Sequence, residues 1–177
     1  MVGTRGTHFI FVDAAHAACG THALTGVLTP TALHIFRVGA RAAKTIVDAD
    51  DMEFAHVAVI DGVHPQFAVW ARPRSLYGHG HAQVYTASGA LVSQVAATTM
   101  LPVGMAASPH GELALLFVYG RGDARRADIV VVNAYSGEGL RREAPEALPD
   151  HGASAAGIAF VPTGVVCCDG DIFTLFQ

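Results

Sequence analysis

The clearest structural unit of this chain begins at Val103 and reads Val-Gly-Met-Ala-Ala-Ser-Pro-His-Gly-Glu-Leu-Ala-Leu-Leu-Phe-Val-Tyr. The apolar runs 103–107 and 112–119 predict a short strand and a longer one, because they are bounded by turn residues and rich in β-forming side chains. Between them, residues 108–111 form a turn in which the proline presets φ and the glycine accepts a positive φ. This stretch therefore predicts an antiparallel hairpin.

The residues that follow extend this hairpin into a larger unit. Asp128–Tyr135 is predicted as a third strand, after a polar loop over 120–127. The sequence Ser136-Gly137-Glu138-Gly139 then turns the chain into a fourth, more polar segment, Leu140–Glu143. We therefore expect residues 103–143 to form a four-stranded antiparallel sheet.

The same order of strands and turns recurs along the chain, and no stretch shows a sustained helical period. Turn glycines return at intervals of roughly 50 residues, which indicates an internal repeat. We expect an all-β protein with about three and three-quarter four-stranded units in one domain, 1–177. The units are expected at 7–51, 54–97, 103–143 and 155–177. Their other strands are predicted at 8–12, 23–28, 32–37, 44–47, 55–60, 67–71, 82–87, 90–95, 157–161, 165–168 and 172–176.

The third unit resembles a blade of the WD-repeat family. Ser108-Pro-His-Gly-Glu-Leu-Ala-Leu-Leu is similar to the turn and apolar run between the first and second strands of such blades. Asp128-Ile-Val-Val-Val-Asn-Ala-Tyr-Ser-Gly-Glu is similar to their third strand and its exit turn. The chain departs from the family because no Trp-Asp pair ends a third strand; the single tryptophan, Trp70, stands in a predicted second strand. The resemblance implies a WD-like β-propeller array of antiparallel blades.

A propeller blade buries its faces against neighbouring blades, and rings usually hold about 4–8 of them. Three arrangements remain open: a compact four-bladed ring with a short last blade, a ring completed by oligomerisation or by a partner chain, or one piece of a longer protein. The composition, 51% apolar and only 15% charged, favours a covered edge.

The resemblance implies protein partners. We expect a non-catalytic protein–protein interaction or scaffold module that acts as a subunit of a larger complex. Its candidate contact residues are placed on loops between blades: Arg72, Arg74, Tyr77, Arg121, Arg125 and Arg126. The alternative is a propeller-type enzyme, or a protein that binds a metal or small ligand in the central channel through His79 and His81. A sandwich or trefoil is the alternative all-β fold.

No catalytic, cofactor-binding or metal-binding residue is assigned from the sequence. His79-Gly-His81 is the only tight pair among ten histidines, and we interpret it as two solvent-facing loop residues because no acid or thiol stands near it. Asp48, Asp50, Asp51 and Glu53 lack the spacing of a calcium loop. Gly-x-Ser-x-Gly is absent, so no nucleophile elbow is predicted.

Charge and cysteine content narrow the functional classes further. The net charge of −4 gives no signature of nucleic-acid binding, and no apolar run reaches the ~18 residues of a membrane span. Three cysteines, two of them adjacent at 167 and 168, indicate a reducing compartment rather than a disulfide framework. The expectation is an intracellular protein, with the cytoplasm favoured and the organelle left open.

Overall fold

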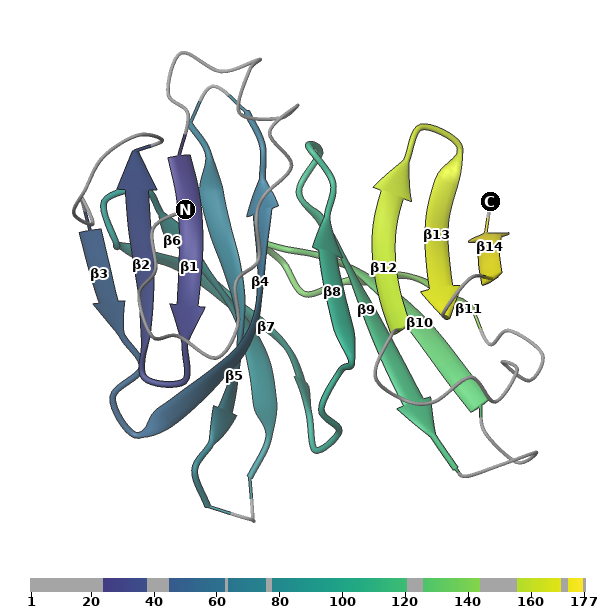
Figure 1. Cartoon of the computed structure of the whole chain (residues 1–177), viewed down its shortest axis with the longest axis horizontal. Coiled ribbons are helices and arrows are strands. Elements are labelled where there is room, and N and C mark those ends of the chain that lie inside the picture. Colours follow the sequence, from purple (N-terminus) through teal and green to yellow (C-terminus); the bar gives the residue numbers. More distant parts are fainter. Residues whose placement is uncertain are drawn as a thin grey trace.

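The computed structural model describes residues 24–37, 45–62, 64–75, 78–120, 126–143, 156–169 and 172–176. Within them the chain is all-β, as predicted, and forms four antiparallel sheets, two of four strands and two of three. We call these sheets A to D in chain order (Figure 1).

The end sheets have three strands each. Sheet A consists of β1 (Leu24–Thr29), β2 (Ala32–Arg37) and β3 (Thr45–Asp48); sheet D consists of β12 (Ala156–Val161), β13 (Gly164–Asp169) and β14 (Ile172–Phe176).

The central sheets have four strands each. Sheet B consists of β4 (Met52–Ile60), β5 (Gln66–Pro73), β6 (Gly80–Thr86) and β7 (Leu91–Thr98); sheet C consists of β8 (Gly104–Ala107), β9 (Glu112–Tyr119), β10 (Arg126–Asn133) and β11 (Gly139–Glu143). Every sheet is a simple meander in which strands pair in chain order.

The four predicted strands of sheet C are all present, but β8, β10 and β11 differ from the predicted bounds by one or two residues. The strand β9 has the predicted bounds, and Gly111 before it adopts the expected positive φ, 82°. The strand β10 ends at Asn133, two residues earlier than predicted, because the Asn133 side-chain oxygen accepts hydrogen bonds from the amides of Tyr135 and Ser136. This Asx turn bends the chain away from the sheet.

The central sheets are packed on both faces. In β5, Phe67, Val69 and Ala71 belong to the core shared with sheet A, whereas Ala68 and Trp70 belong to the core shared with sheet C. All five residues are fully buried. Alternate residues of a strand point to opposite faces, so a strand covered on both sides needs an unbroken apolar run.

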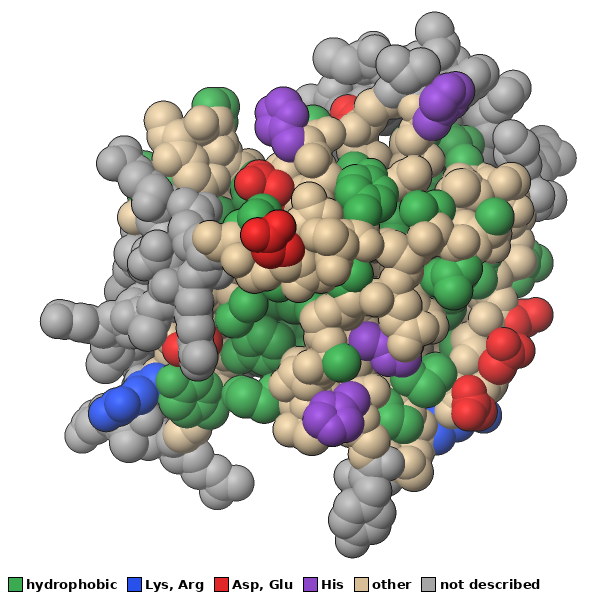
Figure 2. All heavy atoms as spheres, turned by 180° about the vertical axis from the view of Figure 1, so that it is seen from behind, with side chains coloured by type: hydrophobic (Ala, Val, Ile, Leu, Met, Phe, Trp, Pro, Cys, Tyr) green, Lys and Arg blue, Asp and Glu red, His purple; other side chains and the backbone are tan. Residues whose placement is uncertain are grey.

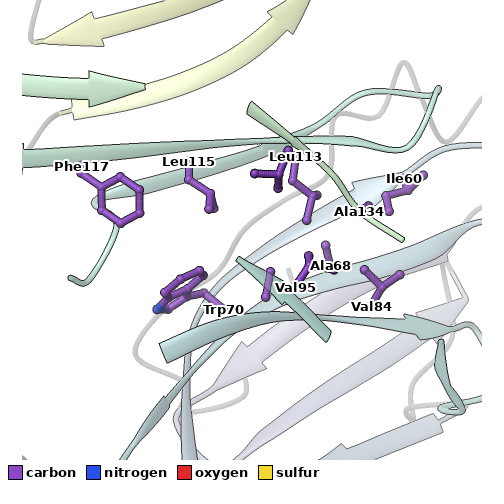
Figure 3. Packing of buried hydrophobic residues seen from close by; sticks show 11 residues of the cluster. Ile60, Ala68, Trp70, Val84, Val95, Leu113, Leu115, Phe117 and Ala134 are labelled. Atoms are coloured by element: carbon purple, nitrogen blue, oxygen red, sulfur yellow. The ribbon is translucent and has the colours of Figure 1, made fainter. Parts of the chain in front are cut away.

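Three apolar cores lie between successive sheets. The A–B core includes Leu33, Ile35 and Phe54, and the C–D core includes Leu116, Ile129 and Cys167. The B–C core, shown in Figure 3, joins two sheets through these residues: Ile60, Ala68, Trp70, Ala82, Val84, Val95, Leu113, Leu115, Phe117, Val132 and Ala134. Each sheet is thus held to the next face to face.

Sheets A and D lie at opposite ends of the array in Figure 1, with B and C between them, so the described residues form no closed ring. The strands β4, β8 and β12 run in the same direction, and β8 contacts both of the others. The strand β1 contacts β4 but runs the opposite way, as the second strand of each later sheet does. The predicted strand 8–12, which precedes β1 in the sequence, lies outside the described residues.

Candidate interaction surface

The structure describes three of the six predicted contact residues. Tyr77, Arg121 and Arg125 lie outside the described residues. The placement of the others on loops between blades is wrong, since Arg72 lies within β5, Arg126 opens β10, and Arg74 directly follows β5. The connections concerned join the second and third strands of one sheet. The predicted units 54–97 and 103–143 already enclose these segments, so the unit bounds, rather than the assignment to loops between blades, agree with the structure.

These residues nevertheless share one end of the array. The strands β5 and β9 run in the same direction, so the connections that follow them lie at the same end, at the bottom of Figure 1. We call it the arginine end, after Arg72, Arg74 and Arg126. The blue side chains visible in Figure 2 lie along the corresponding lower edge.

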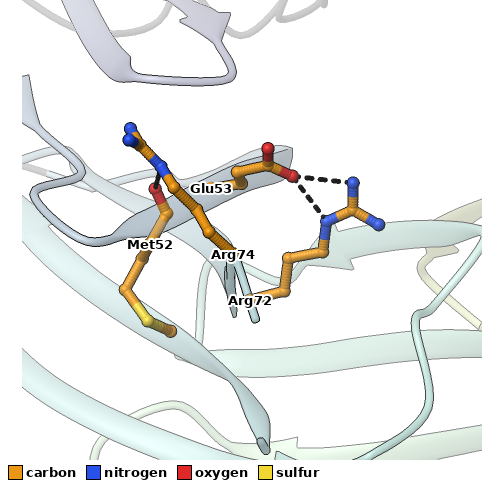
Figure 4. A network of polar contacts seen from close by, with 4 residues as sticks. All are labelled: Met52, Glu53, Arg72 and Arg74. Carbon is orange, nitrogen blue, oxygen red and sulfur yellow. Dashed lines mark hydrogen bonds and ion pairs between the residues drawn. The ribbon is translucent and has the colours of Figure 1, made fainter. Parts of the chain in front are cut away.

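Arg72 and Arg74 are both tied to β4. The Arg72 guanidinium donates to Glu53 Oε2 through Nε at 3.0 Å and Nη2 at 2.7 Å, and Arg74 Nε donates to the Met52 carbonyl oxygen (Figure 4). The side chains of Arg72 and Glu53 are 49% and 34% exposed, so water screens the pair. Arg72 therefore carries little uncompensated charge.

Arg126 is exposed and stands opposite Tyr119 in the register of sheet C. The Tyr119 hydroxyl donates to Asp128 Oδ1 at 3.3 Å, and Asp128 is buried. Arg126 itself makes no side-chain hydrogen bond or ion pair within the part of the chain that the structure describes.

The connection from β7 to β8, which also lies at the arginine end, carries exposed apolar side chains. Met100 and Leu101 are both exposed. The connection is anchored on both sides, because Val103 N donates to the Leu116 carbonyl at 2.7 Å and the His56 ring bonds to the Pro102 carbonyl at 2.7 Å. The sequence analysis did not include Met100 and Leu101 among the candidate contact residues. The Met-Leu-Pro sequence between two predicted strands could have indicated exposed apolar side chains on a loop.

Charged side chains lie at both ends of the array. The turns at the other end carry Asp61 and Glu138, and Arg37 ends β2 at that end as well. At the arginine end, Asp48, Asp50 and Asp51 gather at the turn between β3 and β4, next to sheet A. Within the arginine end, the described arginines therefore lie over sheets B and C.

The interpretation of His81 as a loop residue is wrong. It lies in β6, partly buried, and Gln83 Nε2 lies 3.1 Å from its Nε2, while the Tyr85 hydroxyl donates to Gln83 Oε1 at 2.8 Å. Burial lowers the pKa of His81, against the opposing effect of a hydrogen bond to the His79 backbone. Burial, and then the charge of Asp50, raises the pKa of Tyr85. The sequence predicted a loop here because glycine stands on both sides of His79, whereas β6 begins at Gly80.

No metal site forms from the two histidines. His79 is exposed and lies outside β6. Among the described residues, no group of three or more His, Cys, Asp or Glu side chains is arranged to hold a metal ion.

The outward face of sheet D carries an apolar row. Ile158, Phe160, Val165 and Cys167 pack against sheet C, so alternation turns Ala159, Val166 and Leu175 to the other face, where they stand side by side in the register. Leu175 is 45% exposed. On sheet A the outward side chains include His34 stacked on Phe36, and the exposed Ile46.

The described residues contain no helix that is long and apolar enough to cross a membrane. A comparison of the whole chain with protein-family models, curated proteins and solved structures finds no match.

Proposed function

We propose that this protein is a non-catalytic interaction module, built from WD-like propeller blades, that works as a subunit of a larger assembly. Two features support the proposal. The sheets are antiparallel meanders that pack face to face in chain order, which is how propeller blades are arranged. The Ser-Pro-His-Gly turn before β9, which carries the resemblance, is closed by Ser108 Oγ, which accepts from the amides of His110 and Glu112.

The observation that carries the proposal is the apolar row Ala159, Val166 and Leu175 on the outward face of sheet D. Inside the array every apolar sheet face is covered by another sheet. An apolar sheet face left in water invites association. The cover we propose is an apolar sheet face of another protein chain, either a second copy or a different partner.

The experiment measures the solution mass of the full-length chain at micromolar concentration, alone and after purification from a native extract. We expect a mass above the 18.4 kDa of one chain, or a stable complex with a second protein. Leu175→Asp should dissociate that assembly. Leu140→Asp is the matched control, since Leu140 is 46% exposed on the outer strand of a central sheet.

A chain that stays monomeric under both conditions would contradict the proposal. So would an assembly that survives Leu175→Asp but not Leu140→Asp, because the outward face of sheet D would then play no part. Circular dichroism of both variants checks that the β-structure is retained.

The alternative, a channel enzyme or a small-ligand or metal-binding protein, has no specific support from the residues brought together in the described part of the chain. Metal analysis of the purified protein separates the two functions. A stoichiometric metal that is lost on His81→Ala would favour the alternative.

A further inference from the structure

Sheets A and D each have one face that no other sheet of the described residues covers, and these faces lie at opposite ends of the array (Figure 1). We call them the open face of sheet A and the open face of sheet D. The open face of sheet D carries the apolar row Ala159, Val166 and Leu175.

The open face of sheet A is defined by alternation in β2. Leu33 and Ile35 are buried in the A–B core, so His34 and Phe36 point the other way, with their rings stacked. Ile46 stands opposite His34 in the register and is 56% exposed, so it shares this face. Sheet A therefore presents two rings and an aliphatic side chain, and sheet D presents aliphatic side chains.

The cores inside the array show how one sheet packs on the next. In each core, the face that a sheet turns to the later sheets packs on the face that the next sheet turns to the earlier ones. The strands β4, β8 and β12 run in the same direction, and β8 contacts both of the others, so sheets B, C and D follow one another in the same orientation. The open face of sheet D is of the first kind and that of sheet A is of the second. Sheet D of one chain on sheet A of another would therefore continue the series.

The described array does not join its own open faces, because sheets B and C separate sheet A from sheet D. Propeller rings hold about 4–8 sheets, and two copies of four sheets each give eight. In such a ring each copy covers both open faces of the other, so neither apolar face is left in water. A different protein would have to offer two apolar sheet faces to achieve the same.

Two copies could also associate through their D faces alone. A two-fold axis between two D faces would reverse either the direction of the strands or their order, unlike the contacts among sheets B, C and D. It would also leave the open face of sheet A uncovered. The packing inside the chain therefore favours the head-to-tail contact.

We propose that two copies of this chain join head to tail into a closed ring, with the open face of sheet D of each copy packed on the open face of sheet A of the other. Burial of the exposed Leu175 and Ile46 contributes to the hydrophobic driving force. The inference rests on the proposed function, because it names the occupant of the face of sheet D on which that function depends.

The test measures the mass of the 177-residue chain by sedimentation velocity over a range of protein concentrations. We expect the wild type to have twice the mass of one 18.4 kDa chain. Leu175→Asp and Ile46→Asp should each raise the dissociation constant of the dimer about tenfold or more, because each places an unpaired carboxylate in both contacts of the ring. Leu91→Asp is the matched control, since Leu91 is 53% exposed on the outer strand of sheet B, and it should leave the mass unchanged.

Mixing the two variants tests the head-to-tail arrangement directly. Leu175→Asp keeps an intact open face of sheet A, and Ile46→Asp keeps an intact open face of sheet D. The mixture can therefore form one intact contact, although neither variant alone can form any. We expect a dimer in the mixture at concentrations at which each variant alone is monomeric, which would also show that both variants are folded.

Three results would overturn this inference: wild-type assemblies larger than two chains, an assembly that Ile46→Asp leaves intact, or variants that stay monomeric when mixed. A chain that is monomeric alone but is isolated from a native extract with a different protein would overturn it as well. The proposed function would survive that last result, and would also survive an assembly that only Leu175→Asp dissociates. A chain that is monomeric under both conditions would contradict the proposed function itself.

Discussion

Among the described residues, the central sheets B and C are covered by other sheets on both faces, whereas the end sheets A and D are covered by a sheet on one face. In sheet C, residues 113–117 are all buried, so both sets of alternating side chains lie in a core. In sheet D the same alternation separates the buried Val165 and Cys167 from the outward Val166 and Leu175. The apolar side chains that stabilise the fold are therefore those buried between two sheets. The apolar side chains on the outward face of sheet D contact no other sheet of the described array and do not contribute in this way.

The largest expected effect compares one substitution in the two regions. Leu115→Ala should lower the free energy of unfolding by about 2–5 kcal/mol, because Leu115 is 1% exposed in the B–C core and its loss leaves a cavity. Leu175→Ala should cost less than about 0.5 kcal/mol in the dissociated chain. Urea titration followed by Trp70 fluorescence measures both, since Trp70 is the only tryptophan. Similar losses of unfolding free energy at the two sites would contradict the view that the core between sheets B and C stabilises the fold more than the outward face of sheet D does.

The second prediction concerns close packing against Trp70. A Cβ built on Gly80 lies 2.8 Å from Trp70 Nε1, and the indole is fully buried with no room to give way. Gly80→Ala should therefore cost about 1–3 kcal/mol and change the Trp70 emission spectrum.

The matched control for this prediction is Gly139→Ala. A Cβ at Gly139, on the outer strand of sheet C, meets nothing within 4 Å. The expected change in the free energy of unfolding is within about 0.5 kcal/mol. An equal loss at both glycines would show that backbone effects, rather than the B–C packing, decide the cost.

A smaller effect is expected from His81, which faces the A–B side of sheet B with Gln83 and Tyr85. Its pKa is lowered in the folded chain, so the unfolded chain binds a proton more readily. Stability should fall as the pH drops below the ordinary histidine pKa of about 6.5, and level off once the lowered pKa is passed. His81→Gln should flatten this part of the stability–pH curve, and an unchanged slope would assign the acid sensitivity to other histidines.

The smallest effect is expected at the surface of sheet B. Arg72→Ala should cost no more than about 1 kcal/mol, and the coupling to Glu53 should shrink further in 1 M salt, because both side chains are substantially exposed. A double-mutant cycle with Glu53→Ala measures the coupling. A value above about 2 kcal/mol would mean that this pair helps to hold sheet B together.

The strands of the central sheets follow from local sequence. Unbroken apolar runs such as Leu113–Phe117, together with turns closed by Gly111 or Gly137, determine strand positions because they depend only on alternation and on backbone freedom within a few residues. The bounds of β9 agree with the prediction for this reason.

Tertiary structure decided the rest. Which end of the array a connection lies at depends on the direction of each strand in space, so the sequence could not show that Arg72 and Arg126 lie at the same end. Whether Arg72 is neutralised by Glu53, and whether Val166 faces a core or solvent, depends on contacts between residues far apart in the sequence. The sequence by itself determined an all-β chain of repeated sheets; the packing of those sheets determined which apolar and charged side chains remain exposed.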